Sequence, residues 1–363
     1  MLNKTQLPLM VTRSGAVWNP YEQVGDASDE QFLNSLDAEY HNSLGAEQTI
    51  STLTAILPDI IKQKNYKVAN LSSFVNIAVG KGNPFAAEMM NFAQRNLASD
   101  FESGLSNMRS NAPDGQSDNL ALEPIKRQVI TWTKYMNYNM LENRTMATAT
   151  GGMVDYLKAQ TELRKDLYDL GIQDTVFWGL KSNPTDFQGL LTQSDVTINT
   201  TLITKKIADM TTAEINAFVG AVYEAYRANC NRTAQPEIFL IPEDDFNGLA
   251  KQYSETIGGL TRIQLLEDAF KLLTGNSNFQ VLSTPFAMAS YNAAITGLNK
   301  NRYVLYNKDP KSLIMDVPID FTVTLPVPVD GINFKSAAYS RFTGVKQLRA
   351  PEMLYFDRTP AST

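Results

Sequence analysis

The chain has 363 residues, 43% of them hydrophobic and 19% charged, and its formal net charge at pH 7 is −6. This is the composition of a globular protein, and the length predicts two or three compact units rather than a single core. The acidic balance argues against a protein that grips nucleic acid with a basic face. It allows a protein that surrounds nucleic acid without holding it.

Histidine and cysteine are nearly absent, with one residue of each in the chain. Cys230 excludes an internal disulfide and a cysteine-rich zinc site, and we expect it to be a buried, inert thiol near a helix end. A Ser-His-Asp triad could rest only on His41, which lies in a polar, acidic segment that we expect to be exposed, with no nucleophile elbow nearby. No apolar run is long enough for a membrane span, so we expect the chain to be made and kept in a cytoplasm.

The sequence of the N-terminal third of the chain predicts an arm followed by a long flap. The first 50 residues hold two basic and seven acidic side chains. The weak apolar periodicity of residues 1–45 predicts an arm that is either tail-like or ordered only on a neighbour, and we expect contact with other copies to order it. A helix is expected over 46–57 and strands over 66–79. Gly80 to Pro84 lacks the Lys-Ser/Thr pair of a phosphate loop and is a turn. Residues 96–128 are expected to form a two-stranded flap with a polar tip that lies across a neighbouring copy.

A long amphipathic helix is predicted after Gly151, with Gly171 as its C-terminal cap. Its expected buried stripe, resting on the β-rich C-terminal segment, consists of Met153, Tyr156, Leu157, Leu163, Leu167 and Leu170. Lys158, Glu162 and Lys165 are expected to face outward or toward a neighbour. A short apolar element, Phe177-Trp178-Gly179, and a Gly189-Leu190-Leu191 turn follow.

Helices and strands alternate between about 199 and 300, which predicts helices packed on a central sheet. Thr211 and Glu214 form a capping box, with Met210 and Ile215 as the hydrophobic staple. Further helices are expected over 243–253 and from Thr261 to Gly275, and strands over 237–241 and 279–282. No G-x-G-x-x-G follows a strand, so a dinucleotide site is not predicted. The acidic run 243–245 complements a helix dipole rather than forming a metal site.

The last sixty residues are rich in strand formers, and Pro318, Pro326 and Pro328 suggest edge positions or bends. Turns are expected at 307–310 and at Asp330-Gly331. The expected strands cover 302–306, 313–317, 321–327, 332–339 and 342–348.

This order of elements resembles the major capsid protein family of tailed bacteriophages, with the Hong Kong 97-type fold. The motifs that carry the resemblance span residues 55–357. They are Phe177-Trp178-Gly179, Gly189-Leu190-Leu191, Arg302-Tyr303, Tyr306-Asn307-Lys308-Asp309-Pro310, and Arg341-Phe342-Thr343-Gly344-Val345 with Pro351 after it.

The resemblance implies an α+β fold of five parts. These are an N-terminal arm and first helix (1–75), an extended loop with its flanking strands (76–138), a peripheral domain with a spine helix (139–198), an axial domain (199–301) and a β-rich return to the peripheral domain (302–363). No long charged scaffold segment and no self-crosslinking site is matched.

The function implied is that of a shell protein rather than an enzyme. Pentamers and hexamers would close an icosahedral virion capsid around double-stranded DNA without sequence-specific binding, assembled in the host cytoplasm with portal and scaffolding proteins and a possible decoration protein. The resemblance implies no catalytic, cofactor-binding or metal-binding residue, and no membrane partner. Two alternatives are an encapsulin-type compartment holding protein cargo and a cytoplasmic enzyme that uses carboxylate chemistry.

Overall fold

The computed structural model describes residues 10–11, 17–18, 64–95, 121–141, 144, 156–251 and 261–360. The chain divides into two compact units; the smaller includes residues 134–165 and 324–337, and the larger includes 66–133, 166–323 and 338–363. His41, the helix expected over 46–57 and the tip of the flap lie outside the described residues. Within the described part, no helix has the length and hydropathy needed to cross a bilayer.

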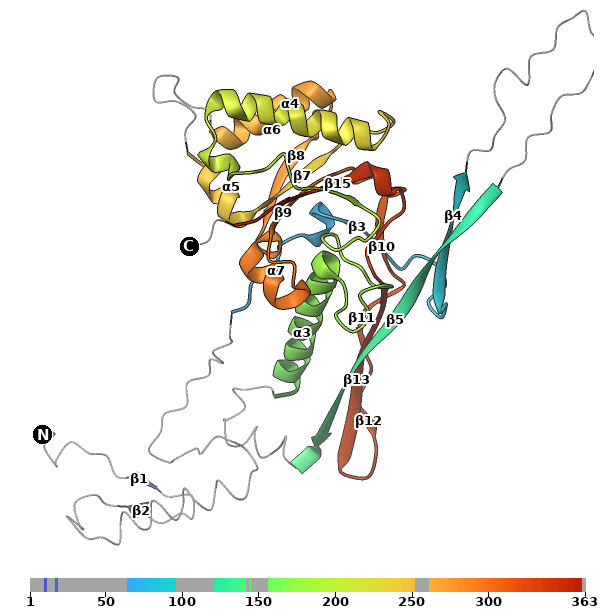
Figure 1. Cartoon of the computed structure of the whole chain (residues 1–363). Helices are drawn as coiled ribbons and strands as arrows, with labels where there is room; N and C mark the ends of the chain where they lie inside the picture. The colour runs from blue at the N-terminus through green and yellow to red at the C-terminus, as the bar shows by residue number, and fades with distance from the viewer. Residues whose placement is uncertain are drawn as a thin grey trace, which may run out of the picture. The chain divides into compact units, whose positions relative to one another are not determined.

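Helices and strands contribute about equally to the fold (Figure 1). The α-helices are α3 (Tyr156–Trp178), α4 (Thr212–Asn229), α5 (Glu243–Leu249), α6 (Arg262–Thr274) and α7 (Ala289–Thr296), with short 3-10 turns η2 (Leu71–Ser73), η4 (Ile207–Asp209), η5 (Pro285–Ala287) and η6 (Ala350–Glu352). The strands are β1 (Met10–Val11), β2 (Val17–Trp18), β3 (Asn76–Val79), β4 (Glu88–Arg95), β5 (Ala121–Asn139), β6 (Thr197–Asn199), β7 (Ile238–Pro242), β8 (Gln280–Thr284), β9 (Asn301–Tyr306), β10 (Leu313–Val317), β11 (Ile319–Val323), β12 (Val327–Pro328), β13 (Asn333–Thr343), β14 (Lys346–Gln347) and β15 (Met353–Arg358).

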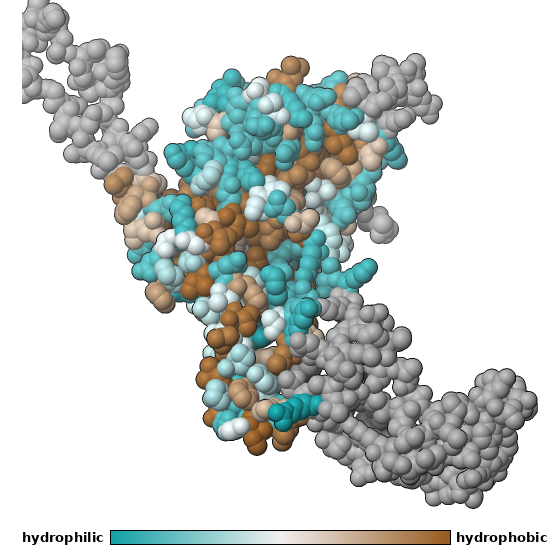
Figure 2. Space-filling model, turned by 180° about the vertical axis from the view of Figure 1, so that it is seen from behind, coloured by the Kyte–Doolittle hydropathy of each residue, from teal (hydrophilic) through white to brown (hydrophobic). Residues whose placement is uncertain are grey.

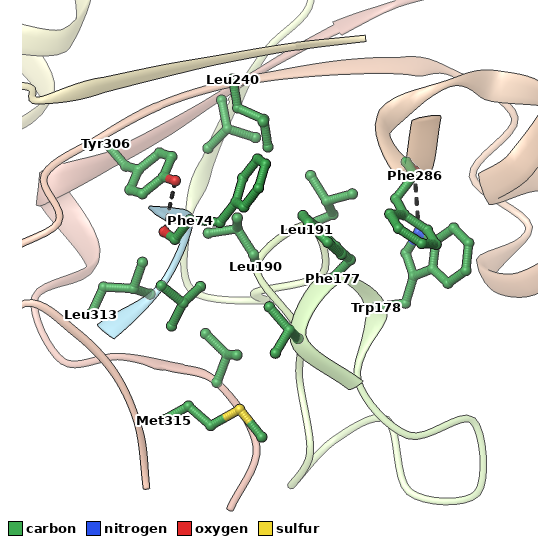
Figure 3. Packing of buried hydrophobic residues seen from close by; sticks show 14 of the residues in the cluster. Phe74, Phe177, Trp178, Leu190, Leu191, Leu240, Phe286, Tyr306, Leu313 and Met315 are labelled. Carbon is green, nitrogen blue, oxygen red and sulfur yellow. Dashed lines mark hydrogen bonds between the residues drawn. The ribbon is translucent and has the colours of Figure 1, made fainter. Parts of the chain in front are cut away.

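A mixed five-stranded sheet of order β6-β15-β9-β7-β8 lies at the centre of the larger unit. Most positions of its inner strands are apolar, because both faces are covered. On β7, Phe239 and Ile241 belong to the core beneath α4 and α6, while Ile238 and Leu240 belong to a second core with the end of α3. Figure 3 shows part of this second core, where the Tyr306 hydroxyl donates to the Phe74 carbonyl at 2.8 Å.

Strand β9 lies in the same sheet as strands from both the α/β segment expected over 199–301 and the β-rich segment expected over 302–363. We grouped residues 302–306 with the β-rich C-terminal part, but β9 pairs antiparallel with β7 on one side and β15 on the other. The central sheet therefore continues across residue 301, and the boundary that we expected there does not coincide with a break in hydrogen bonding.

The helices of the α/β segment follow their sequence signals closely. The Glu214 carboxylate accepts the Thr211 backbone N–H at 2.7 Å at the start of α4, and Met210 and Ile215 are both buried. Helix α6 starts after Thr261 and ends at Gly275, whose φ of 65° is left-handed. Cys230 follows α4 and is 1% exposed, as expected.

Several expected boundaries were wrong, mostly by a few residues. Within 66–79 only Asn76–Val79 is a strand, preceded by η2, and α5 stops at Leu249 rather than 253. The expected strand over 321–327 is split between β11 and β12, and the two expected over 332–348 are the single long β13 followed by β14.

Besides the β1–β2 pair, the described residues form two further sheets. In one, β10 lies between β14 and β3; in the other, the order is β11-β13-β5-β4, with β12 paired on β13. The described base of the flap is confirmed as a ribbon, with β4 antiparallel to β5 from the pair Glu88–Gln128 to the pair Arg95–Ala121. Pro328 lies in β12, which pairs only with β13 among the described strands, in agreement with an edge position.

The long helix was predicted correctly as an element, but its bounds and buried face were wrong. It runs from Tyr156 to Trp178, so Gly171 lies inside it, and Val176 to Trp178 form its last turn. Leu163 and Leu167 are 63% and 49% exposed. Of the side chains expected to face outward, Lys158 and Lys165 are exposed and Glu162 is half-buried.

The face of α3 that is buried repeats every four residues and contains Arg164, Tyr168, Ile172 and Val176. The expected contact with the β-rich C-terminal segment is present in the larger unit, where the hydroxyls of Tyr168 and Ser340 are 2.8 Å apart. Val176 and Phe342 lie in the same core. The helix therefore rests on this segment through a different stripe from the one that we predicted.

This register makes a testable distinction between two aliphatic positions of α3. Ile172→Ala should lower the free energy of unfolding by about 2 kcal/mol, because a buried aliphatic side chain is lost from the core. Leu167→Ala should change it by at most about 0.5 kcal/mol, because half of that side chain already faces solvent. Denaturant unfolding of unassembled subunits measures both. A larger loss for Leu167→Ala than for Ile172→Ala would contradict the observed register.

Candidate functional site

The motifs singled out in the sequence meet at the C-terminal end of α3. The last carbonyls of any helix lack partners within the helix and must find them elsewhere. Here the Leu190 N–H donates to the Val176 carbonyl at 2.7 Å, and the Leu191 N–H donates to the Phe177 carbonyl at 2.9 Å. The Thr192 hydroxyl donates to the Trp178 carbonyl at 2.9 Å. The Gly-Leu-Leu turn is therefore the cap of the long helix.

Two glycines allow the turn to approach this closely. Gly179 has a φ of 81° and forms a bridge with Gln188. A Cβ on Gly189 would lie 2.4 Å from the Phe177 carbonyl carbon and 2.4 Å from the Trp178 nitrogen. Both contacts are with backbone atoms, which cannot rotate away. We call this contact between Gly179 and Gly189 the glycine crossing; it explains why both motifs contain glycine.

A buried arginine ties the turn to the central sheet. Arg302 of β9 holds Asp357 of β15 through two bonds, Nε to Oδ1 and Nη2 to Oδ2, both 2.7 Å. Its third donor group, Nη1, donates to the Leu191 carbonyl at 2.6 Å, and the guanidinium lies 4.5 Å from the centre of the Tyr355 ring. The Arg302 and Asp357 side chains are 7% and 3% exposed.

Gln193 links the turn to the Gly-Val motif near the C-terminus. Its side-chain amide donates to the carbonyls of Gly189, at 2.7 Å, and Val345, at 2.9 Å. The Tyr355 hydroxyl donates to the Leu190 carbonyl at 2.6 Å and accepts the Gln193 backbone N–H at 3.1 Å. Burial raises the pKa of the Tyr355 phenol, which therefore remains a neutral donor near neutral pH.

Arginines also anchor the base of the flap. Arg341 of β13 donates to the Pro84 carbonyl and, at 2.9 Å, to the Ala86 carbonyl in the segment before β4. Arg127 of β5 lies 2.5 Å from Asp316 of β10, and both side chains are buried. Within the larger unit, the base of the ribbon is thus held to β10 by a buried ion pair and to β13 by the hydrogen bonds of Arg341.

Asp245 of the acidic run has a structural role that we did not foresee. Its carboxylate accepts the backbone N–H groups of Ile207 and Ala208, both at 2.8 Å, and the Tyr303 hydroxyl at 2.7 Å, and the residue is 0% exposed. Burial of the Tyr303 phenol, together with the nearby charge of Asp245, raises the pKa of Tyr303. One carboxylate therefore joins α5 to η4 and β9.

Asp245→Asn should cost about 2 kcal/mol of subunit stability, because the amide replaces one acceptor oxygen by a donor that faces an N–H or O–H group. Asp244→Asn is the matched control. Its partner Lys206 lies 3.0 Å away in a partly exposed pair, so the loss should be below about 1 kcal/mol. Thermal unfolding of both variants checks the difference, and equal losses would show that the Asp245 contacts contribute little.

The arrangement has the character of a scaffold, in which buried polar groups join distant parts of the chain. No group of three or more potential metal ligands occurs among the described residues. A cleft of about 260 Å³ lies between the ribbon base and the turn, and its charged side chains are of both signs: Glu88, Lys126, Arg127, Asp186 and Lys346. This lining includes no cysteine or histidine.

Comparison with known proteins supports the same interpretation. The family model described as "Major capsid protein" matches residues 111–358. Among solved structures, the capsid of Myoviridae phage XM1 is similar with a TM-score of 0.61 and 14% identity, over 86% of this chain and 99% of that one. Microbacterium phage Oxtober96 gives a TM-score of 0.51 and 11% identity, over 85% and 95% of the two chains. A search of curated protein sequences finds no significant match.

The fold is of the Hong Kong 97 type. Because the family model covers most of the chain, the chain belongs to the major capsid protein family. Membership implies a structural role, self-association into capsomers and a place in the virion capsid. It does not favour the encapsulin-type alternative.

Sequence reasoning found the motifs but missed the residues that join them. Arg302, Arg341 and the glycines were singled out, and the structure brings Arg302, Gly179, Gly189 and Gly344 together. Gln193, Tyr355, Asp357, Arg127 and Asp316 were not singled out. For Asp316 a signal existed, because it is a lone carboxylate in the otherwise apolar strand β10 and must find a partner there.

Proposed function

We propose that copies of this chain form pentamers and hexamers that close an icosahedral shell around double-stranded DNA. The match to the major capsid protein family carries the proposal. Closed symmetry repeats a few surface contacts many times, so that individually weak contacts suffice. The net charge of −6 suits a container whose genome must remain mobile, because an acidic wall does not bind phosphate.

The ribbon of β4 and β5 supports assembly through exposed apolar side chains on one of its faces. Cross-strand pairs share a face of the ribbon, which places Met90, Phe92, Leu122 and Pro124 on one side, together with the polar residues Glu88, Gln94, Lys126 and Gln128. Phe92 is 63% exposed and Leu122 is 52% exposed. A two-stranded ribbon is marginal in water by itself, so this face is suited to packing on another protein surface.

The finer assignment follows the family resemblance. Residues 1–75 serve as the arm and first helix, 76–138 as the extended loop, 139–198 as the peripheral domain, 199–301 as the axial domain and 302–363 as the return. The arm and the loop lie on neighbouring copies, and the proposed role requires no catalytic, metal-binding or cofactor-binding residue. Assembly takes place in the host cytoplasm with portal and scaffolding proteins, and a decoration protein is a further partner.

Electron microscopy of the purified protein tests the proposal. Negative-stain images and sedimentation should show closed shells or capsomer rings rather than dimers or tetramers. When the chain is expressed with its portal and scaffolding partners, DNA inside the particles should resist nuclease until the shells are disrupted. Protein that sediments only as small oligomers under all assembly conditions would contradict the proposed function.

A further inference from the structure

Two half-exposed tyrosines of the larger unit stand against the buried ring of Phe286. The ring centroid of Tyr66 lies 6.0 Å from that of Phe286, and the ring centroid of Tyr291, on α7, lies 6.5 Å from it. Tyr66 and Tyr291 are 50% and 48% exposed, whereas Phe286 is 5% exposed. Within the part of the chain that the structure describes, the two tyrosine rings do not contact each other. They therefore stand apart, each against Phe286.

The three rings are held in place by the surrounding structure. Phe286 stacks on Phe177 with their centroids 4.7 Å apart, and the Trp178 indole N–H donates to the Phe286 carbonyl at 3.2 Å (Figure 3). The backbone of Tyr66 is fixed because its carbonyl accepts a hydrogen bond from the Gln173 side chain of α3 at 3.1 Å. A site whose groups are already in position loses little conformational freedom when it binds a ligand.

A carboxylate without a partner lies beside these rings. Glu243 is the first residue of α5 and is half-buried, and its side chain makes no hydrogen bond or ion pair with any described residue. The start of a helix favours a negative charge there. The pKa of the Tyr66 phenol is raised by burial and then by the nearby Glu243 carboxylate and Tyr291 phenol, so the three polar ends lie close together. We call Tyr66, Tyr291, Phe286 and Glu243 the tyrosine site.

Two lysines near the tyrosine site are engaged elsewhere. Lys67 follows Tyr66 in the chain, but its Nζ lies 2.7 Å from a carboxylate oxygen of Asp166. The Lys206 Nζ lies 3.0 Å from Asp244, the residue after Glu243. These lysines therefore leave the Glu243 charge unpaired beside the rings.

An apolar partner does not fit the tyrosine site. Figure 2 shows apolar surface on the β4–β5 ribbon and on the hairpin of β12 and β13. If a surface of that kind covered the tyrosine site, the Glu243 carboxylate would lose its water and gain no partner, which is strongly unfavourable. The group that fits must be able to contact aromatic rings and must also carry a positive charge.

We propose that the tyrosine site binds an organic cation, in the form of an ammonium or guanidinium group. The face of an aromatic ring attracts such a group within about 6 Å of the ring centre. The Glu243 carboxylate accepts its N–H donors in charge-assisted hydrogen bonds, and the two phenol oxygens are further acceptors. A metal ion fits less well, because it requires several oxygen ligands and no cluster of three acidic, histidine or cysteine side chains suited to a metal is found in the described ranges.

The cation has two sources in principle, which share this chemistry. A free polyamine would bind the separate subunit. An arginine or lysine side chain of a second copy would reach the tyrosine site only when copies associate.

Fluorine NMR of unassembled subunits labelled with fluorotyrosine tests the site, and Tyr66→Phe and Tyr291→Phe assign the two resonances. Spermidine and ethylguanidinium should shift both resonances with dissociation constants in the millimolar range, whereas sodium chloride at equal ionic strength should not. Glu243→Gln should weaken the binding of both probes about tenfold. Glu224→Gln is the matched control, because its carboxylate is exposed and pairs with Arg232 on α4 and the loop after it. It should leave the affinities unchanged.

Assembled particles distinguish the two sources of the cation. Mild nitration followed by mass spectrometry measures how readily Tyr66 and Tyr291 react. If a side chain of a second copy fills the site, both tyrosines should be protected in particles without added amine, and Glu243→Gln should restore their reaction. If a free polyamine is the ligand, both should react in amine-free particles, and spermidine should protect them.

Two results would overturn the proposal. The first is that neither probe shifts the Tyr66 and Tyr291 resonances and that assembly gives these tyrosines no protection that depends on Glu243. The second is that Glu243→Gln binds the probes as tightly as Glu224→Gln, since the carboxylate would then play no part. The titration of subunits requires no assembly, so its result is independent of whether the chain forms shells.

Discussion

Arg302→Met should lower the free energy of unfolding of the subunit by about 3–5 kcal/mol, among the largest effects of a single side chain in this protein. The substitution leaves the Asp357 carboxylate, whose side chain is 3% exposed, without its two bonds. The Leu191 carbonyl also loses its donor at the cap of α3. Chemical denaturation of unassembled subunits measures the loss.

A matched control variant and a double variant identify the cause of the stability loss. Lys346→Met breaks a pair with Asp195 in which the carboxylate side chain is 59% exposed, so it should cost less than about 1 kcal/mol. Adding Asp357→Leu to Arg302→Met should recover part of the stability, because the unpaired buried charge is removed. Equally small losses in the free energy of unfolding for Arg302→Met and Lys346→Met would show that Arg302 and Asp357 do not hold the Gly189-Leu190-Leu191 turn on the central sheet.

The elements with local signals were predictable from the sequence. The box at Thr211 and Glu214 fixed the start of α4, and Gly275 marked the end of α6, because capping depends on residues within one turn of the helix. The strand expected over 237–241 was found as β7, Ile238–Pro242, because its apolar residues follow one another directly in the chain. These features depend on little beyond their own neighbours in the chain.

The buried face of α3 was predicted wrongly because two stripes of side chains on that helix could each have been the buried one. Leu163 and Leu167 suggest one stripe, but the buried one contains Arg164 and Tyr168, which are amphipathic and can bury their stems when their polar ends find partners. The Tyr168 partner is Ser340, far away in the sequence. Gly171 was taken for a cap, yet tertiary packing carries the helix beyond it.

The contacts between the motifs could not be predicted from local sequence patterns, because they also depend on residues far apart in the chain. The turn at Gly189, the guanidinium of Arg302 and the carboxylate of Asp357 come from three distant parts of the chain, and nothing in their spacing fixes their contact. The resemblance to capsid proteins supplied their order but not their hydrogen bonds. Gln193, a single polar residue in a loop, had no local signal at all.

Substitutions at two glycines of the same region should have opposite signs. Gly189→Ala should prevent folding or cost more than about 4 kcal/mol, because its Cβ would lie 2.4 Å from backbone atoms of Phe177 and Trp178. The turn would have to move away from the helix end and lose the N–H bonds of Leu190 and Leu191 to the last helical carbonyls. Soluble yield and thermal unfolding of the free subunit report the effect.

Gly171→Ala is the control, since this glycine lies inside α3, is exposed, and a Cβ there meets nothing within 4 Å. Alanine in a helix interior is favoured over glycine by about 0.5–1 kcal/mol, so this variant should be more stable than the wild type. Both changes add the same methyl group along one helix and its cap, and only the distance to backbone atoms differs. A stable, well-folded Gly189→Ala subunit would show that the glycine crossing is looser than the structure describes.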